Sequence, residues 1–124
     1  MARRRATKTV DELLAQARAT LPHRPLPAEA LQAQASGALL IDIREDDQRR
    51  EDGLIPGAIV LPRNSLEWRC DPASAWRHPA ITRRDLHIIL ICHQGYQSSL
   101  AAATLQQLEA KRPGLPERLT SAFG

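Results

Sequence analysis

The chain lacks most of the features that mark secreted, membrane-spanning or metal-binding proteins. Its apolar stretches are far too short to cross a bilayer, and the basic start Arg3–Arg5 is not followed by the apolar core of a signal peptide. Only two cysteines are present, Cys70 and Cys92, with no C-x-x-C pair and no histidines at metal-ligand spacing. We therefore expect a cytoplasmic protein with reduced, free thiols, no bound metal and no cofactor.

Aromatic residues are also scarce, at 3% of the chain, whereas hydrophobic residues make up 43%. The 124 residues suffice for one domain, and its core must be aliphatic. The formal net charge of +3 comes from four basic residues among the first ten, because the rest has 13 basic and 14 acidic residues. A nucleic-acid-binding domain would need a basic face with stacking aromatics, so we expect neither a nucleic acid nor a membrane as partner.

Proline, glycine and charge divide the chain into four parts. We expect a disordered basic tail over 1–8 and an N-terminal helix over 9–21, which Thr9 caps and Glu12 completes as a capping box. The main domain is expected over 22–110. Residues 111–124 carry proline, arginine and glutamate, and are expected to form an irregular C-terminal tail.

Three short apolar runs, at 38–43, 58–61 and 86–92, have the length of buried strands. Helical patterns over 28–35 and 98–110 alternate with them. Continuous apolar runs are typical of strands that are covered on both faces, as in parallel sheets. The pattern therefore predicts an α/β fold, an open parallel sheet with helices on both faces.

Cys92 stands at the end of the strongest predicted strand, where ligands bind in open parallel sheets. The polar loop after it contains Gly95, which lets the loop curl with its amides inward, and leads to a helix that Ser98 and Ser99 can cap. The unpaired amides at a helix start would stabilise a thiolate, the nucleophilic form of cysteine. The alternative interpretation is that Cys92 is simply a small buried hydrophobe.

Three motifs together resemble those of rhodanese-like domains. Cys92–Ser98 resembles the active-site loop Cys-x-x-Gly-x-Arg-Ser, and Asp42–Arg44 resembles the Asp-x-Arg segment that ends an early strand. The segment 53–58 resembles the signature Gly-His-Ile-Pro-Gly-Ala. The motifs occur in family order over about residues 37–108, and the combination is far more specific than any one of them.

The resemblance implies a rhodanese fold, a five-stranded parallel sheet flanked by helices, and a sulfurtransferase that carries sulfur as a persulfide on Cys92. The donor would be thiosulfate or a persulfide, the acceptor a thiol or cyanide, and a protein sulfur carrier is a further candidate partner. Cys92 would be the nucleophile, and the substrate-binding loop would consist of His93, Gln94, Gly95, Tyr96, Gln97 and Ser98.

Three further residues are expected to line the pocket: Asp42, Arg44 and Arg63. A carboxylate at a strand end usually accepts loop amides, so Asp42 is expected to be mainly structural. Arg44 matches the family's pocket arginine, and Arg63 follows the second strand at the pocket mouth. His93 is expected to face solvent with its backbone amide in the loop.

Two departures from the family pattern bear on function. Gln97 replaces the loop arginine, a fixed cation for an anionic donor, which favours a neutral or protein-borne persulfide over thiosulfate. The irregular tail leaves no candidate for the family's last strand, so we expect that strand to be missing and a sheet edge to be open.

Two other functions compete with sulfur transfer. Gln97 and the altered C-terminus are compatible with a catalytically weak binding or regulatory module. A phosphatase of the related loop type needs an arginine six positions after its cysteine, and Ser98 occupies that position here.

Overall fold

The computed structural model describes residues 7–21, 24–93, 95–108 and 119–123. Its elements in chain order are α1 (Val10–Thr20), α2 (Pro27–Ala35), β1 (Leu39–Asp42), α3 (Asp46–Asp52), β2 (Ile59–Val60), the 3-10 turn η1 (Arg63–Ser65), α4 (Leu66–Cys70), β3 (Ile88–Cys92), α5 (Tyr96–Leu105), the 3-10 turn η2 (Gln106–Leu108) and β4 (Leu119–Phe123). No helix among the described residues is long and apolar enough to cross a membrane.

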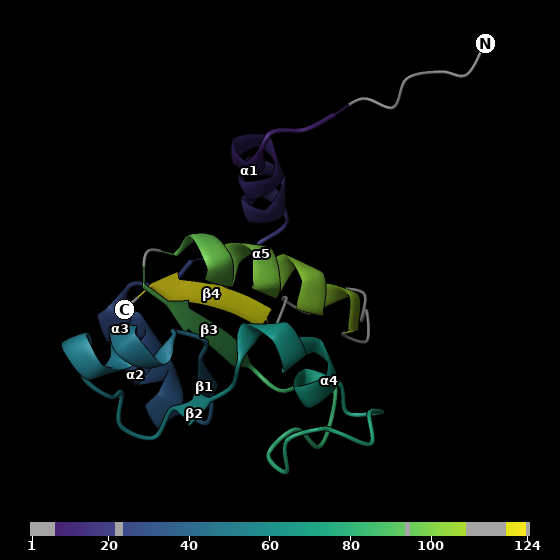
Figure 1. Ribbon diagram of the computed structural model, residues 1–124. Helices are drawn as coiled ribbons and strands as arrows, with labels where there is room; N and C mark the ends of the chain where they lie inside the picture. The colour runs from purple at the N-terminus through teal and green to yellow at the C-terminus, as the bar shows by residue number, and fades with distance from the viewer. Residues whose placement is uncertain (1–6, 22–23, 94, 109–118, 124) are drawn as a thin grey trace.

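The four strands form one parallel sheet in the order β2-β1-β3-β4 (Figure 1). β1 pairs with β2 on one side and with β3 on the other, and β4 pairs with β3 along its whole length. The carboxyl ends of β1, β2 and β3 therefore meet at one edge of the sheet, the edge at which Cys92 ends β3.

Both faces of the sheet are covered, as the unbroken apolar strands predict. Leu40, Ile89 and Ile91 pack with Ala30 of α2 on one face. Residues of alternate register, among them Ile41 and Leu90, pack against α4 and α5 on the other. The expected α/β class, an open parallel sheet flanked by helices on both faces, is confirmed.

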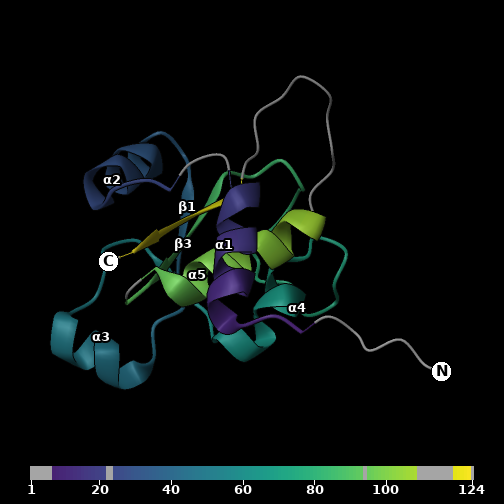
Figure 2. The ribbon, with the colours of Figure 1, turned by 90° about the horizontal axis from the view of Figure 1, so that it is seen from above.

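The N-terminal helix follows its sequence signals closely. α1 covers Val10–Thr20, and the Thr9 hydroxyl accepts a hydrogen bond of 3.2 Å from the backbone amide of Glu12, as a capping residue does. The helix crosses over the outer side of α5 (Figure 2). The Gln106 side chain donates to the Thr20 carbonyl at 3.1 Å, so α1 is attached to the domain. Of the expected basic tail, residues 1–6 lie outside the described residues.

The expectation for the C-terminus is wrong at 119–123. This part of the predicted irregular tail forms β4, in register with β3 from Ile88↔Leu119 to Cys92↔Phe123. The last strand of the sheet is thus present. Its five residues include Thr120, Ser121 and Ala122, so their composition does not predict a strand. The strand forms because the edge of β3 offers backbone hydrogen bonds. Residues 111–118 and 124 lie outside the described residues.

The helix after Cys92 also differs from its prediction. It begins at Tyr96, two residues early, and Gly95 is its N-cap. Ser98 and Ser99 therefore lie inside the first turns, where both are fully buried, instead of capping the helix.

Candidate active site

Cys92 is buried, but its sulfur is surrounded by hydrogen-bond donors. The backbone amides of Gly95 and Ser98 donate to its Sγ at 3.0 and 3.3 Å. The Cys92 thiol donates to the Ser98 hydroxyl oxygen at 3.2 Å, and the same hydroxyl can donate to the sulfur once Cys92 is a thiolate. Such donors stabilise negative charge on sulfur, so the position is unlike that of a cysteine in sealed apolar packing.

The loop owes its shape to Gly95. This residue has a φ of 79°, in the left-handed region where a side chain would be strained. The turn allows the chain to reverse within three residues and to bring the Gly95 amide back to Cys92. The Ser99 hydroxyl donates to the Gly95 carbonyl at 2.7 Å and fixes the turn from the helix side.

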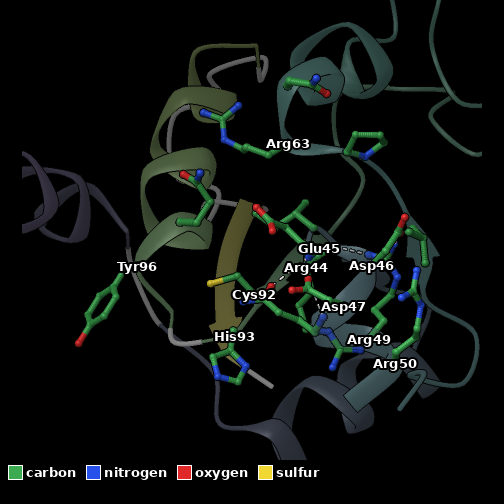
Figure 3. Close-up of a pocket in the computed structure, with 16 residues that line it drawn as sticks. Arg44, Glu45, Asp46, Asp47, Arg49, Arg50, Arg63, Cys92, His93 and Tyr96 are labelled. Carbon is green, nitrogen blue, oxygen red and sulfur yellow. Dashed lines mark hydrogen bonds and ion pairs between the residues drawn. The ribbon is translucent and has the colours of Figure 1, made fainter. Parts of the chain in front are cut away.

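A cavity of about 1010 Å³ opens over Cys92 at the carboxyl edge of the sheet. Figure 3 shows Cys92 between the charged side chains of α3 on one side and Tyr96 on the other. Six of the expected site residues line this cavity: Arg44, Arg63, Cys92, His93, Tyr96 and Gln97. Asp42, Gly95 and Ser98 lie behind its wall, and Gln94 falls outside the described residues.

Asp42 and Arg44 form a buried ion pair. The guanidinium donates through Nε and Nη2 to the Asp42 carboxylate at 2.9 to 3.2 Å, and the side chains are only 1% and 5% exposed. Hydrogen bonding to Asp42 raises the pKa of Arg44 above its ordinary value, against the opposing effect of burial. Asp42 also accepts the Arg44 backbone amide at 3.0 Å, the structural role that the sequence favoured.

The same ion pair is bound to the segment 53–58, the third of the sequence motifs. Arg44 Nη2 donates to the Gly53 carbonyl at 2.8 Å, which ties the end of β1 to the segment after α3. Gln34 of α2 donates to the Pro56 carbonyl at 3.0 Å. The segment 53–58 therefore joins the pocket wall to the opposite face of the sheet, and Leu54 is largely exposed.

Other arginines of the cavity wall are also bound to protein oxygens. Arg63 Nη1 lies 2.8 Å from the Glu67 carboxylate, and Arg49 donates to the Arg44 carbonyl and the Asp46 carboxylate. Since Arg44, Arg49 and Arg63 each have an internal acceptor, none of the three is a preformed free cation for an anionic ligand.

His93 lies at the mouth of the cavity. Its Nδ1 is 3.2 Å from the Asp52 carboxylate, and both side chains are about half exposed, at 47% and 46%. The imidazole therefore contacts α3 at the cavity mouth and is open to solvent on one side.

Two residues, Arg18 and Cys70, have properties that the sequence alone does not indicate. Arg18 of α1 reaches the Cys92 loop from 77 positions away, and no local pattern could have indicated this contact. Cys70, a free thiol in the core, has a pKa raised to about 12, chiefly by burial and further by nearby Glu67.

Among the described residues, no group of three or more His, Cys, Asp or Glu side chains is arranged to hold a metal ion.

The geometry can be compared with known proteins. The profile of the rhodanese-like domain matches residues 26–116. The chain belongs to the rhodanese-like domain family. No curated protein sequence matches it.

Two solved structures resemble this rhodanese-like domain. One is a Rhodopseudomonas palustris protein of unknown function, described as a possible tyrosine phosphatase, with a TM-score of 0.75 and 25% identity, covering 99% of this chain and 89% of that one. The other is the human single-domain sulfurtransferase TSTD1, with a TM-score of 0.53 and 21% identity, covering 81% of this chain and 86% of that one. Both support the fold.

Proposed function

We propose that this rhodanese-like domain is a sulfurtransferase that carries sulfur as a persulfide on Cys92. The observation that carries the proposal is the hydrogen bonding of the Cys92 sulfur by two backbone amides and a hydroxyl beneath an open cavity. Donors placed around a sulfur anion stabilise both the attacking thiolate and the terminal sulfur of a persulfide. A cytoplasmic location suits the proposal, because both cysteines are free thiols.

The reaction has two halves. The Cys92 thiolate attacks the sulfane sulfur of the donor, a bond forms between Sγ and that sulfur, and the donor remnant leaves with the electron pair of the broken bond. A thiolate or cyanide acceptor then attacks the outer sulfur, and the Cys92 thiolate is regenerated. No net oxidation occurs, so no cofactor is required.

The residues of the site divide into four roles in this proposal. Cys92 is the nucleophile, and the loop 93–98 provides the amides and the Ser98 hydroxyl. Tyr96, Gln97 and Arg63 shape the cavity. Asp42 and Arg44 maintain the wall beside the loop through their ion pair.

The cavity favours a persulfide donor over thiosulfate. Gln97 lines the wall where the family has arginine, and Arg44, Arg49 and Arg63 are held by internal acceptors. A small dianion would have to compete with these internal acceptors or use the exposed Arg50 of the wall, whereas the volume admits a larger thiol-borne donor. Restoring the cation with Gln97→Arg should lower the thiosulfate concentration needed for half-maximal sulfur uptake by about tenfold, leaving uptake from a neutral persulfide unchanged.

Two competing functions are less well supported. A phosphatase would match the description of the Rhodopseudomonas palustris neighbour, but the sixth position after Cys92 is Ser98, whose amide and hydroxyl contact the sulfur. A binding module without catalysis would be compatible with Gln97. It predicts that Cys92→Ser leaves every activity of the protein unchanged.

Intact-protein mass spectrometry tests the proposal directly. The protein is incubated with thiosulfate and, separately, with a low-molecular-weight persulfide, and its mass is read before and after cyanide. We expect a cyanide-removable gain of about 32 Da, one sulfur atom, that Cys92→Ser abolishes and Cys70→Ser retains. A folded wild-type protein that gains no sulfur from either donor would refute the proposal.

A further inference from the structure

Arg18 contacts the Cys92 loop at three points although it belongs to the N-terminal helix. Its Nη2 lies 3.5 Å from the Gly95 carbonyl, and its Nε lies 3.4 Å from the Ser99 hydroxyl. Its guanidinium carbon lies 5.5 Å from the centre of the Tyr96 ring, within range of a cation–π interaction. Each contact is long or weak by itself, but all three converge on the first turn of α5.

The packing of α1 holds Arg18 in a fixed position beside the loop. The helix crosses over α5 (Figure 2), and the bond from Gln106 to the Thr20 carbonyl fixes its C-terminal end, two residues from Arg18. Arg18 is partly buried, and it lies one residue after the buried Ala17. Its side chain therefore leaves a packed position and reaches the loop from outside the cavity, which it does not line.

Holding the Gly95 carbonyl has a defined effect on the next amide. A trans peptide directs its C=O and its N–H to opposite sides, and no peptide in the described chain is cis. Arg18 and Ser99 hold the Gly95 carbonyl on the side of α1. The Tyr96 N–H consequently points away from α1, and the amides on either side of it, those of Gly95 and Ser98, donate to the Cys92 sulfur at 3.0 and 3.3 Å.

We propose that Arg18 is a positioning residue of the active site, which holds the Gly95 carbonyl in place and so keeps the neighbouring amides of Gly95 and Ser98 directed at the sulfur of residue 92. This inference rests on the proposed function for its meaning in catalysis. Its effect on the thiol is measurable without any sulfur donor. Arg18 also gives the site a positive charge outside the cavity, in a chain whose loop has Gln97 instead of arginine.

The geometry requires arginine and not merely positive charge. The planar guanidinium presents Nε and Nη2 to two acceptors at once, and its central carbon lies over the Tyr96 ring. A lysine ammonium can reach one of these acceptors but cannot span both in a fixed orientation. Arg18→Lys should therefore preserve the charge without restoring the loop.

The rate of alkylation of Cys92 by iodoacetamide, followed by peptide mass mapping, tests the inference. We expect Arg18→Ala to slow alkylation about tenfold at constant pH, and Arg18→Lys to recover little of that loss. Arg83→Ala is the matched control, because Arg83 pairs with Asp85 on the exposed surface, and it should react like wild type. If Arg18→Ala does not fold by circular dichroism, Arg18→Gln replaces it. An unchanged or faster rate in the variant, or full recovery with lysine, overturns the inference.

Sulfur uptake separates this inference from the proposed function. If wild type forms the persulfide, Arg18→Ala should lower the maximal rate of uptake about tenfold and leave the half-saturating donor concentration unchanged, because Arg18 does not line the cavity. A variant that changes only the half-saturating concentration contradicts the positioning role. If wild type never takes up sulfur, the proposed function fails, and the alkylation rates still decide the role of Arg18.

Discussion

The buried ion pair between Asp42 and Arg44 allows a quantitative prediction. In Asp42→Asn, the amide oxygen can still accept the Arg44 backbone N–H, which Asp42 now accepts at 3.0 Å. The substitution removes the negative charge that faces Nε and Nη2. The variant therefore leaves a guanidinium that is 5% exposed without its counter-charge.

The expected cost follows from this burial. Breaking a buried ion pair by removing one partner typically costs about 3–5 kcal/mol, because the remaining charge is neither solvated nor neutralised. The Gly53 carbonyl, 2.8 Å from Nη2, and the nearby charge of Asp52 offer partial compensation, so we expect the lower part of that range, about 3 kcal/mol. For a domain of this size, such a loss lowers the melting temperature by about 10 °C.

Urea denaturation followed by circular dichroism measures the change, with Glu67→Gln as the matched control. That substitution breaks the pair between Arg63 and Glu67, whose side chains are 28% and 33% exposed, and should cost no more than about 1 kcal/mol. If Asp42→Asn is no more destabilising than Glu67→Gln, burial does not determine the contribution of the pair, and the reasoning fails.

Two further predictions concern the thiols. Ser98→Ala removes the hydroxyl that lies 3.2 Å from the Cys92 sulfur. Because a hydrogen bond to a charged group contributes about 1.5–3 kcal/mol, sulfur uptake from a persulfide donor should slow by about tenfold to a hundredfold in stopped-flow measurements. An unchanged rate would show that the two amides suffice. Burial raises the pKa of Cys70 to about 12 from 9.0, so the unfolded chain loses this proton first as the pH rises. The free energy of unfolding should therefore fall by about 1.4 kcal/mol per pH unit between pH 9 and 12. In urea titrations at about pH 8 and 10, Cys70→Ala should lose less of this free energy between the two pH values than wild type does.

Much of the fold could be predicted from sequence because its signals are local. The apolar run that ends in Cys92 is long and β-branched, and the structure places a fully buried strand at Ile88–Cys92. The helical pattern over 28–35 is likewise found as α2, which begins at Pro27, a residue suited to the first turn of a helix. In these segments, the propensity of each residue agrees with its burial, so pattern alone is sufficient.

The missed features depend on contacts between distant segments. β4 contains small and polar residues, and it forms because β3 offers it a hydrogen-bonding edge, a property of the sheet that its own residues do not encode. The start of α5 was misplaced because Ser98 and Ser99 resemble capping residues, whereas they instead bind Cys92 and the Gly95 carbonyl. Arg18 is likewise invisible locally, since its partners lie far along the chain.

The order of the strands has a consequence for biosynthesis. The strand that carries Cys92 occupies the interior of the sheet, and one of its two neighbours, β4, is translated after every other strand. A nascent chain that has emerged only as far as α5 already holds the whole Cys92 loop, but one side of the supporting strand has no partner. The Cys92 thiol is therefore expected to reach its final environment only after β4 has emerged, and until then that unpaired strand edge is a natural target for holding chaperones.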